Sequence, residues 1–126
     1  MDNIDILPTA RTPALKLDFD ACEFMLEGES YPEDTTKFYT QPIDQVLAFL
    51  GSKHDKSITC KFKLKYFNSS SAKVIMDLFT AMEESAASGN SVKIEWHYVA
   101  DDDNMQELGE EFSEELSLAN FELIPV

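Results

Sequence analysis

The chain has 126 residues, 44% hydrophobic and 27% charged, and its 24 acidic against 10 basic residues give a net charge of −14. This length suits a single domain over residues 1–126 with one core, and the composition is that of a folded protein. The acidic balance excludes nucleic acid and anionic membranes as partners, because both would repel this surface.

The first six residues lack the basic and long apolar segments of a secretory signal, and no apolar stretch reaches membrane-spanning length. We therefore expect a cytoplasmic protein. Cys22 and Cys60 are expected to be reduced and buried, with a disulfide as the open alternative. Two cysteines make a poor zinc site, so the sequence predicts neither a metal nor a cofactor.

The first third of the chain predicts a hairpin followed by a helix. Apolar and polar residues alternate over residues 15–19 and again over residues 22–26, which is typical of paired strands. A further short strand over residues 4–7 is left open. Residues 28–40 are expected to form a loop. The helix is then expected to have Pro42 in its first turn and to end at Gly51.

The remainder of the chain alternates strands with helices. The expected strands cover residues 58–66, 92–98 and 121–124, and the expected helices have apolar stripes over residues 75–86 and 105–116. Leu78 lies at the centre of the first stripe and is expected in the core. Asp103 and Gln106 have the spacing of a capping box at the start of the last helix.

This order, β-β-α-β-α-β-α-β, predicts an α/β fold. Strand–helix–strand units require parallel pairing with right-handed crossovers. The strands keep one charged face, as Lys61, Lys63 and Lys65 do in the longest of them. Since sheets covered on both faces have near-continuous apolar strands, we expect a mixed β-sheet with helices mainly on one face and water on the other.

Three serines, Ser69 to Ser71, lie where the longest strand gives way to a helix. Unpaired N–H groups and the helix dipole favour a phosphate there, whether bound or covalently attached. The ordinary interpretation is that one serine hydroxyl only caps the helix. Asn68 either forms the turn or orients a hydroxyl, and Lys73, one turn on, is either a counter-charge or a solvated residue.

Several segments carry a resemblance to a known family. They are Thr12-Pro13, Gly28-Glu29-Ser30-Tyr31-Pro32-Glu33, Tyr66-Phe67-Asn68-Ser69-Ser70-Ser71, Trp96-His97-Tyr98 and the acidic run over residues 101–111. Through them the chain, from about Leu7 to Ile124, resembles the SiaC family of bacterial regulatory phosphoproteins. That resemblance implies an STAS-like fold, akin to the anti-sigma-factor antagonists.

The resemblance also implies a phosphorylation switch. A serine/threonine kinase related to anti-sigma kinases would modify the hydroxyl after the Asn, and a PP2C-type phosphatase would remove the phosphate. The unphosphorylated form would activate a diguanylate cyclase or another effector protein, raising cyclic-di-GMP and favouring biofilm formation. Here the modified residue would be Ser69, with Ser70 as second choice, because the family often has Thr at this position.

The loop containing Tyr31, Pro32 and Glu33 follows a strand and precedes a helix, as the serine segment does. Parallel strands would bring both segments to one end of the sheet, so this loop is a candidate partner surface. The alternative is a plain connector fixed by proline. Farther on, residues 101–115 hold eight acidic residues and no basic one, either as a solvated face or as a docking site for a basic partner.

Other functions fit the sequence less well. Ser70 and Lys73 match the Ser-x-x-Lys pattern of β-lactamases, but the chain has no Lys-Thr-Gly and is too short for that fold. Asp101 to Asp103 lack the glycine and distal glutamate of a calcium loop. We therefore expect no enzyme. The alternative function is an anion- or phosphometabolite-binding domain that uses the helix N-terminus at residues 69–71.

Overall fold

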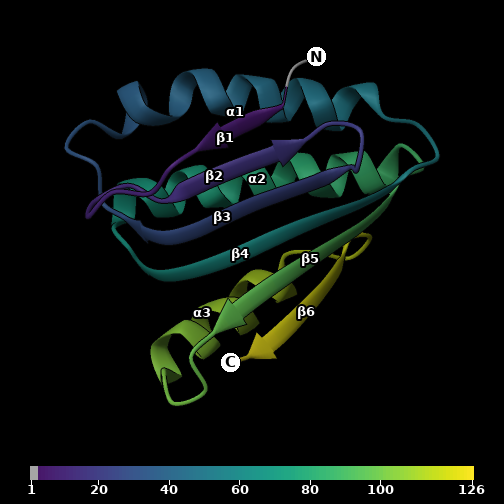
Figure 1. Ribbon diagram of the computed structural model, residues 1–126. Coiled ribbons are helices and arrows are strands. Elements are labelled where there is room, and N and C mark those ends of the chain that lie inside the picture. Colours follow the sequence, from purple (N-terminus) through teal and green to yellow (C-terminus); the bar gives the residue numbers. More distant parts are fainter. Residues whose placement is uncertain (1–2) are drawn as a thin grey trace.

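The computed structural model describes residues 3–126, which form a six-stranded mixed sheet with three helices on one face (Figure 1). The strands are β1 (Ile4–Ile6), β2 (Ala14–Asp18), β3 (Glu23–Ser30), β4 (Ser57–Phe67), β5 (Ser91–Tyr98) and β6 (Asn120–Pro125). The helices are α1 (Thr35–Ser52), α2 (Ser69–Ala87) and α3 (Asp103–Glu114). The predicted mixed α/β fold is confirmed, and the strand left open at the amino terminus is present as β1.

The strands lie in the sheet in the same order as in the sequence. The pairs β1–β2 and β2–β3 are antiparallel, whereas β3–β4, β4–β5 and β5–β6 are parallel. Each parallel pair is joined by one helix, as strand–helix–strand units require. Within residues 3–126, no helix is long and apolar enough to cross a membrane.

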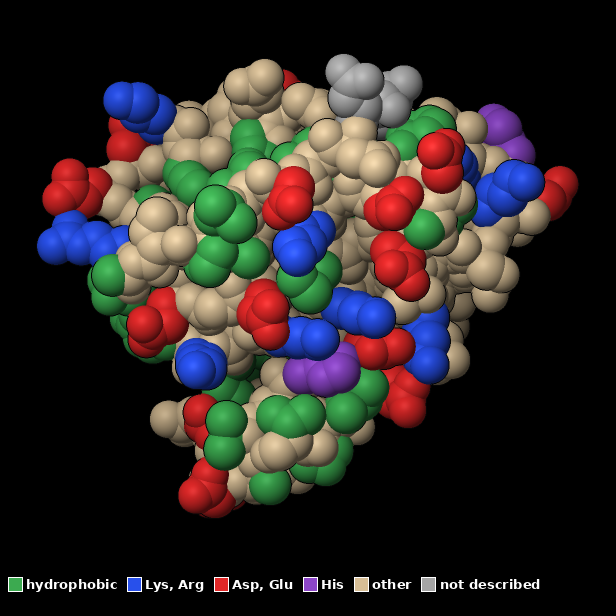
Figure 2. Space-filling model, viewed as in Figure 1, with side chains coloured by type: hydrophobic (Ala, Val, Ile, Leu, Met, Phe, Trp, Pro, Cys, Tyr) green, Lys and Arg blue, Asp and Glu red, His purple; other side chains and the backbone are tan. Residues whose placement is uncertain are grey.

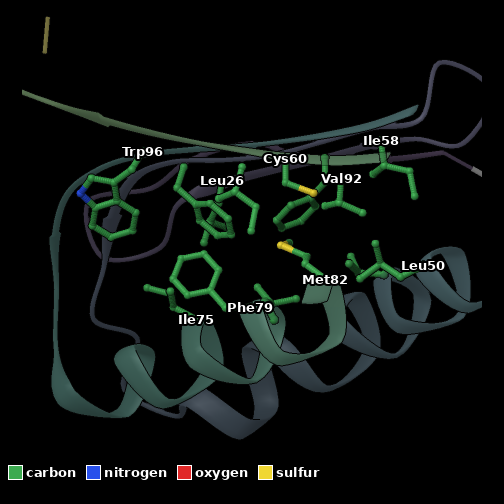
Figure 3. Packing of buried hydrophobic residues seen from close by; sticks show 14 of the residues in the cluster. Leu26, Leu50, Ile58, Cys60, Ile75, Phe79, Met82, Val92 and Trp96 are labelled. Atoms are coloured by element: carbon green, nitrogen blue, oxygen red, sulfur yellow. The ribbon is translucent and has the colours of Figure 1, made fainter. Parts of the chain in front are cut away.

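The core lies between the helices and one face of the sheet. Ile75, Phe79 and Met82 rise from α2 and Leu50 from α1 to meet side chains of the strands (Figure 3). Leu78 is fully buried, which confirms its predicted place in the core. Burial raises the pKa of the Cys60 thiol to about 12, because the thiolate would lose its hydration. The thiol is therefore protonated and unreactive.

No helix covers the opposite face of the sheet in the described residues, and Figure 2 shows basic, acidic and histidine side chains side by side on it. Lys93 Nζ lies 3.1 Å from a carboxylate oxygen of Glu122, and His97 Nε2 lies 2.9 Å from Glu95 Oε1. The charged side of the strand alternation therefore faces water, as the sequence predicts.

Helix α3 packs closely against the sheet because Gly109 has no side chain. A Cβ at Gly109 would lie 2.6 Å from Trp96 Cδ1 and 2.5 Å from Leu123 Cδ2. The short distance between backbones also lets Trp96 Nε1 donate a hydrogen bond of 2.9 Å to the carbonyl oxygen of Met105. The first half of α3 is thereby fixed over β5.

A single carboxylate joins α2 to the loop between α3 and β6. Glu83 accepts hydrogen bonds of 2.8 to 3.0 Å from the backbone N–H groups of Ser117, Leu118 and Ala119, and one from the Ser117 hydroxyl. These donors, with the Ala119 N–H foremost, lower the pKa of Glu83 to about 2. The loop after α3 is therefore bound to α2 through a charged group.

Three predicted boundaries are wrong. Residues 28–30 belong to β3 rather than to a loop, and α1 begins at Thr35, so that Pro42 lies inside this helix. The helix begins early because Asp34 Oδ1 accepts a hydrogen bond from the Lys37 N–H at 3.0 Å. It also continues past Gly51 to Ser52.

The predicted capping box at the start of α3 is wrong as well. Asp102, not Asp103, is the N-cap, and its Oδ1 accepts a hydrogen bond from the Met105 N–H at 3.1 Å. Gln106 instead donates to Glu110 at 3.3 Å. In a run of three aspartates, the sequence alone does not distinguish which one caps the helix.

Candidate phosphorylation and docking site

The serine segment begins with an asparagine cap. Asn68 has an extended backbone, with φ −85° and ψ 176°, and its Oδ1 accepts a hydrogen bond of 2.9 Å from the Ser71 N–H. This is the usual arrangement for the residue before a helix. Asn68 is therefore the cap, and the interpretation of Ser69 or Ser70 as the capping hydroxyl is wrong.

Ser71 is fully buried beneath this segment. Its Oγ accepts a hydrogen bond of 2.7 Å from the Ser30 hydroxyl, which lies 2.6 Å from the Tyr39 phenol oxygen. Burial raises the pKa of Tyr39, because a buried phenolate would be poorly solvated, so the phenol stays protonated. The three hydroxyls join β3, α1 and α2, and Ser71 is closed to any modifying enzyme.

Ser69 and Ser70 are exposed and occupy the first two positions of α2. Helix geometry leaves the N–H groups of these two residues without intrahelical acceptors, and the positive end of the helix dipole lies there. A phosphate ester on either hydroxyl can accept hydrogen bonds from these amides. This end of α2 therefore has both an accessible hydroxyl and donors for its phosphate.

The two serines have different surroundings. Ser70 and Lys73 line a groove of about 630 Å³ between α1 and α2, which Ser69 does not line. Asp34, Asp44 and Asp77 line the same groove, together with Glu33. A phosphate on Ser70 would therefore meet several carboxylates and one ammonium group, whereas Ser69 lies outside this acidic groove.

The loop after β3 lies beside the serine segment, as the parallel pairing of β3 and β4 predicts. The Asn68 N–H donates a hydrogen bond of 3.0 Å to the Ser30 carbonyl oxygen. The ring of Tyr31 lies edge-on to the ring of Tyr66, with 5.7 Å between centroids. Glu33 is exposed and pairs with Arg11 at 2.8 Å, whereas Pro32 is buried. Tyr31 and Glu33 can contact a partner, and Pro32 shapes the loop.

Tyr66 is an exposed aromatic residue near the end of β4, although strict alternation along this strand would place it on the buried face with Leu64. Gly28 lies opposite Leu64 but Glu29 lies opposite Tyr66, so Lys65 is an extra residue in β4 and the alternation changes phase. The Tyr66 side chain is consequently 50% exposed. The alternation pattern contains no signal for this bulge, although Gly28, with φ +118°, has a conformation that favours glycine.

The described residues bring no three His, Cys, Asp or Glu side chains together as metal ligands. The chemical groups at this site are hydroxyls, amides, aromatic rings and carboxylates. Such a set can accept a phosphate and contact a protein.

Comparisons with known proteins identify the family of this chain. The family described as SiaC family regulatory phosphoprotein matches residues 6–126. A Pseudomonas aeruginosa protein of uncharacterised function is 35% identical over 117 residues, which cover 93% of this chain and 92% of that protein. The crystal structure of apo-SiaC from P. aeruginosa has 35% identity and a TM-score of 0.87, covering 98% of this chain and 99% of that one.

A second similar structure is that of the P. aeruginosa diguanylate cyclase SiaD in complex with its activator SiaC. The similar chain in it has 33% identity and a TM-score of 0.86, covering 95% of this chain and 98% of that one. The sequence match and the fold agree over nearly the full length. This chain belongs to the SiaC family of regulatory phosphoproteins.

Proposed function

We propose that this chain is a non-enzymatic switch protein that is reversibly phosphorylated on Ser69. Its unphosphorylated form binds and activates a diguanylate cyclase in the cytoplasm, and so controls cyclic-di-GMP and biofilm formation. A serine/threonine kinase adds the phosphate and a PP2C-type phosphatase removes it. The whole chain acts as one domain.

The observation that carries this proposal is the state of the three serine hydroxyls. Ser69 is exposed at the first position of α2, and the cap that it could have supplied comes from Asn68. Ser71 is buried in a hydroxyl network, and Ser70 faces a groove lined by carboxylates. Of the three, Ser69 best combines access for a kinase with free helix amides for the phosphate.

Support for the effector comes from a relative. The P. aeruginosa protein SiaC, similar to this chain over nearly its whole length, is described as the activator of the diguanylate cyclase SiaD. A phosphate adds close to two negative charges and considerable bulk. On Ser69 it would alter the surface formed by Tyr31, Tyr66 and the start of α2.

The test is peptide-level mass spectrometry of the protein from its native host, with and without the phosphatase. We expect phosphate on Ser69, its loss in Ser69→Ala, and its retention in the matched control Ser70→Ala. In parallel, purified unmodified protein should raise the rate at which a diguanylate cyclase of the host forms cyclic-di-GMP, and Ser69→Asp should raise it less.

Two results would contradict the proposal. A fully unmodified population in a phosphatase-deficient host would remove the switch and favour the anion-binding alternative. Full cyclase activation by the protein phosphorylated on Ser69 would separate the modification from effector control.

A further inference from the structure

The groove of about 630 Å³ between α1 and α2 has no part in the site described so far. The two helices lie side by side and run in the same direction, because each joins two parallel strands (Figure 1). Thr36, Thr40 and Asp44 line the groove from α1, and Ser70 and Asp77 line it from α2. Their helical spacing places them on facing sides of the helices. We define the α1/α2 groove by these residues.

Carboxylates dominate the rim of the α1/α2 groove. Besides Asp44 and Asp77, Glu33 and Asp34 line it, and Lys73 is the one basic residue among its lining residues. Asp44 and Asp77 are exposed, and neither forms an ion pair with another residue in the range 3–126. Lysine or arginine on a partner can therefore neutralise two free carboxylates without breaking a contact within this chain.

The floor of the α1/α2 groove is apolar and rigid. Ile43 and Val74 line it, and both are partly buried against the core. The buried ring of Tyr39 also lines it, and the Tyr39 phenol is fixed by the hydroxyl network with Ser30 and Ser71. Because that network joins α1, α2 and β3, the groove is already formed before a partner binds.

The α1/α2 groove reaches the proposed phosphorylation residue without containing it. Ser70 lines the groove, whereas Ser69, one residue earlier, does not. A phosphate on Ser69 therefore leaves the lining of the groove unchanged. A partner that the phosphate displaces has to contact Ser69 itself. An enzyme that modifies Ser69 is instead best held by a surface beside this residue.

We propose that the α1/α2 groove is the docking site of the kinase, which binds it through a basic segment. The kinase and its target Ser69 rest on the proposed function. A stable protein interface covers about 800 Å² on each partner, so a kinase acting on Ser69 also covers the neighbouring surface. Kinases hold the phosphates of ATP with lysine and magnesium, which makes the opening of their active site electropositive. The carboxylates of the groove complement that charge.

The groove binds the kinase but takes no part in the transfer. The Ser69 hydroxyl oxygen bonds to the γ-phosphorus of ATP, the bond from that phosphorus to ADP breaks, and the hydroxyl proton passes to a base of the kinase. Asp77 lies about 12 Å from Ser69 along α2, at 1.5 Å per residue. Loss of the rim carboxylates should therefore raise KM and leave kcat unchanged.

A second copy of this chain does not fit the groove. It would bring the same carboxylates and a net charge of −14. Repulsion between like charges disfavours that contact.

The first test is a steady-state assay with the full chain, a purified serine/threonine kinase of the host and ATP. Phosphate on Ser69 is quantified by peptide-level mass spectrometry. Asp44→Lys/Asp77→Lys should raise KM by at least about tenfold, with kcat within about twofold. Added salt should raise KM for the unmodified chain more than for this variant, because it screens the contacts that the variant has lost. Circular dichroism checks the fold.

The matched control for charge is Asp20→Lys/Glu23→Lys. It changes the net charge equally, at exposed residues beside the turn between β2 and β3, and should leave KM within about twofold. An equal rise of KM in both pairs would mean that net charge, not the groove, determines binding, and would overturn the proposal.

A second pair of variants tests the shape of the groove. Thr40→Arg places a long cationic side chain in the groove and should raise KM by at least about fivefold. Ala48→Arg makes a similar change at an exposed position of α1 that does not line the groove, and should leave KM within about twofold. Equal KM values for these two variants would contradict docking in the groove.

The remaining outcomes separate this inference from the proposed function. An unchanged KM for Asp44→Lys/Asp77→Lys would overturn the docking site and leave the proposed function intact. Failure of every serine/threonine kinase of the host to modify Ser69 in the unmodified chain would overturn both.

Three results would assign the groove a different role and overturn the proposal. Transfer of the phosphate from Ser69 to Ser70 in Asp44→Lys/Asp77→Lys would make the carboxylates a selector between the serines. Loss of cyclase activation by this variant in its unphosphorylated form would assign the groove to the effector. A raised KM for the PP2C-type phosphatase, with the KM of the kinase unchanged, would assign it to the phosphatase.

Discussion

At the scale of single residues, Asn68 caps the start of α2, so neither Ser69 nor Ser70 has to supply the cap. Asn68→Ala removes the cap of the Ser71 N–H and should cost about 1 kcal/mol of unfolding free energy, measured by urea denaturation. Asn68→Asp keeps an acceptor at the positive end of the helix and serves as the control, with a change below about 0.5 kcal/mol. If Asn68→Ala were as stable as the unmodified chain, the cap would contribute nothing to the free energy of unfolding.

The lowered pKa of the Glu83 carboxyl group predicts how the free energy of unfolding depends on pH. Its folded pKa of about 2 is below the ordinary value of 4.5, so its contribution is fully present above about pH 4.5. That contribution is lost as the pH falls toward 2, because the carboxylate is then protonated. Glu83→Gln should therefore be less stable at pH 7 and lose less stability between about pH 5 and pH 2.

The measurement for Glu83 is the urea midpoint across that pH range. Glu84→Gln, one residue along α2 and exposed, is the matched control and should keep the slope of the unmodified chain. Parallel pH curves for Glu83→Gln and the unmodified chain would contradict the role assigned to this carboxylate.

At the scale of elements, the packing of α3 depends on Gly109. Gly109→Ala places a methyl group against Trp96 and Leu123 and should cost about 1–3 kcal/mol, because α3 must move away from the sheet. Gly51→Ala is the matched control: no atom lies within 4 Å of its added Cβ, and it should stabilise α1 by about 0.5–1 kcal/mol. Urea denaturation followed by the fluorescence of the single tryptophan measures both, and equal effects would contradict the close packing.

Helices and strands with a strong apolar periodicity of their own can be predicted from the sequence. The alternation in β4 and β5 and the apolar stripe of α2 identify these elements without tertiary information. The start of α1 gives no such signal, because residues 35–41 hold only Phe38 and Tyr39 as apolar residues and Pro42 follows them. A polar side-chain cap at Asp34 begins this helix, and apolar periodicity does not report such a cap.

The candidate site was predictable to a similar extent. A run of serines after a strand indicates a helix start, and parallel pairing indicates that Tyr31 lies near it. The burial of Ser71 was not predictable, because its partner Ser30 is 41 residues away in the sequence. Neither was the exposure of Tyr66, which depends on one extra residue in β4.

At the scale of the whole molecule, the net charge of −14 predicts a response to salt. Screening of self-repulsion should raise the melting temperature between about 10 mM and about 300 mM NaCl, and the rise should be larger for the phosphorylated protein. Differential scanning calorimetry of both forms measures it. A lower melting temperature in salt would show that ion pairs such as Lys93–Glu122 outweigh the repulsion.

The sequential strand order affects how the chain folds during synthesis. Because each strand pairs with the next along the sequence, the sheet can grow by one strand at a time as the nascent chain leaves the ribosome. A chain that has emerged through α2 already contains Asn68, Ser69 and the partners of Ser71. Helix α3 and β6 emerge later, so the amino-terminal end of α2, with the proposed phosphorylation residue Ser69, can be complete before the sheet is.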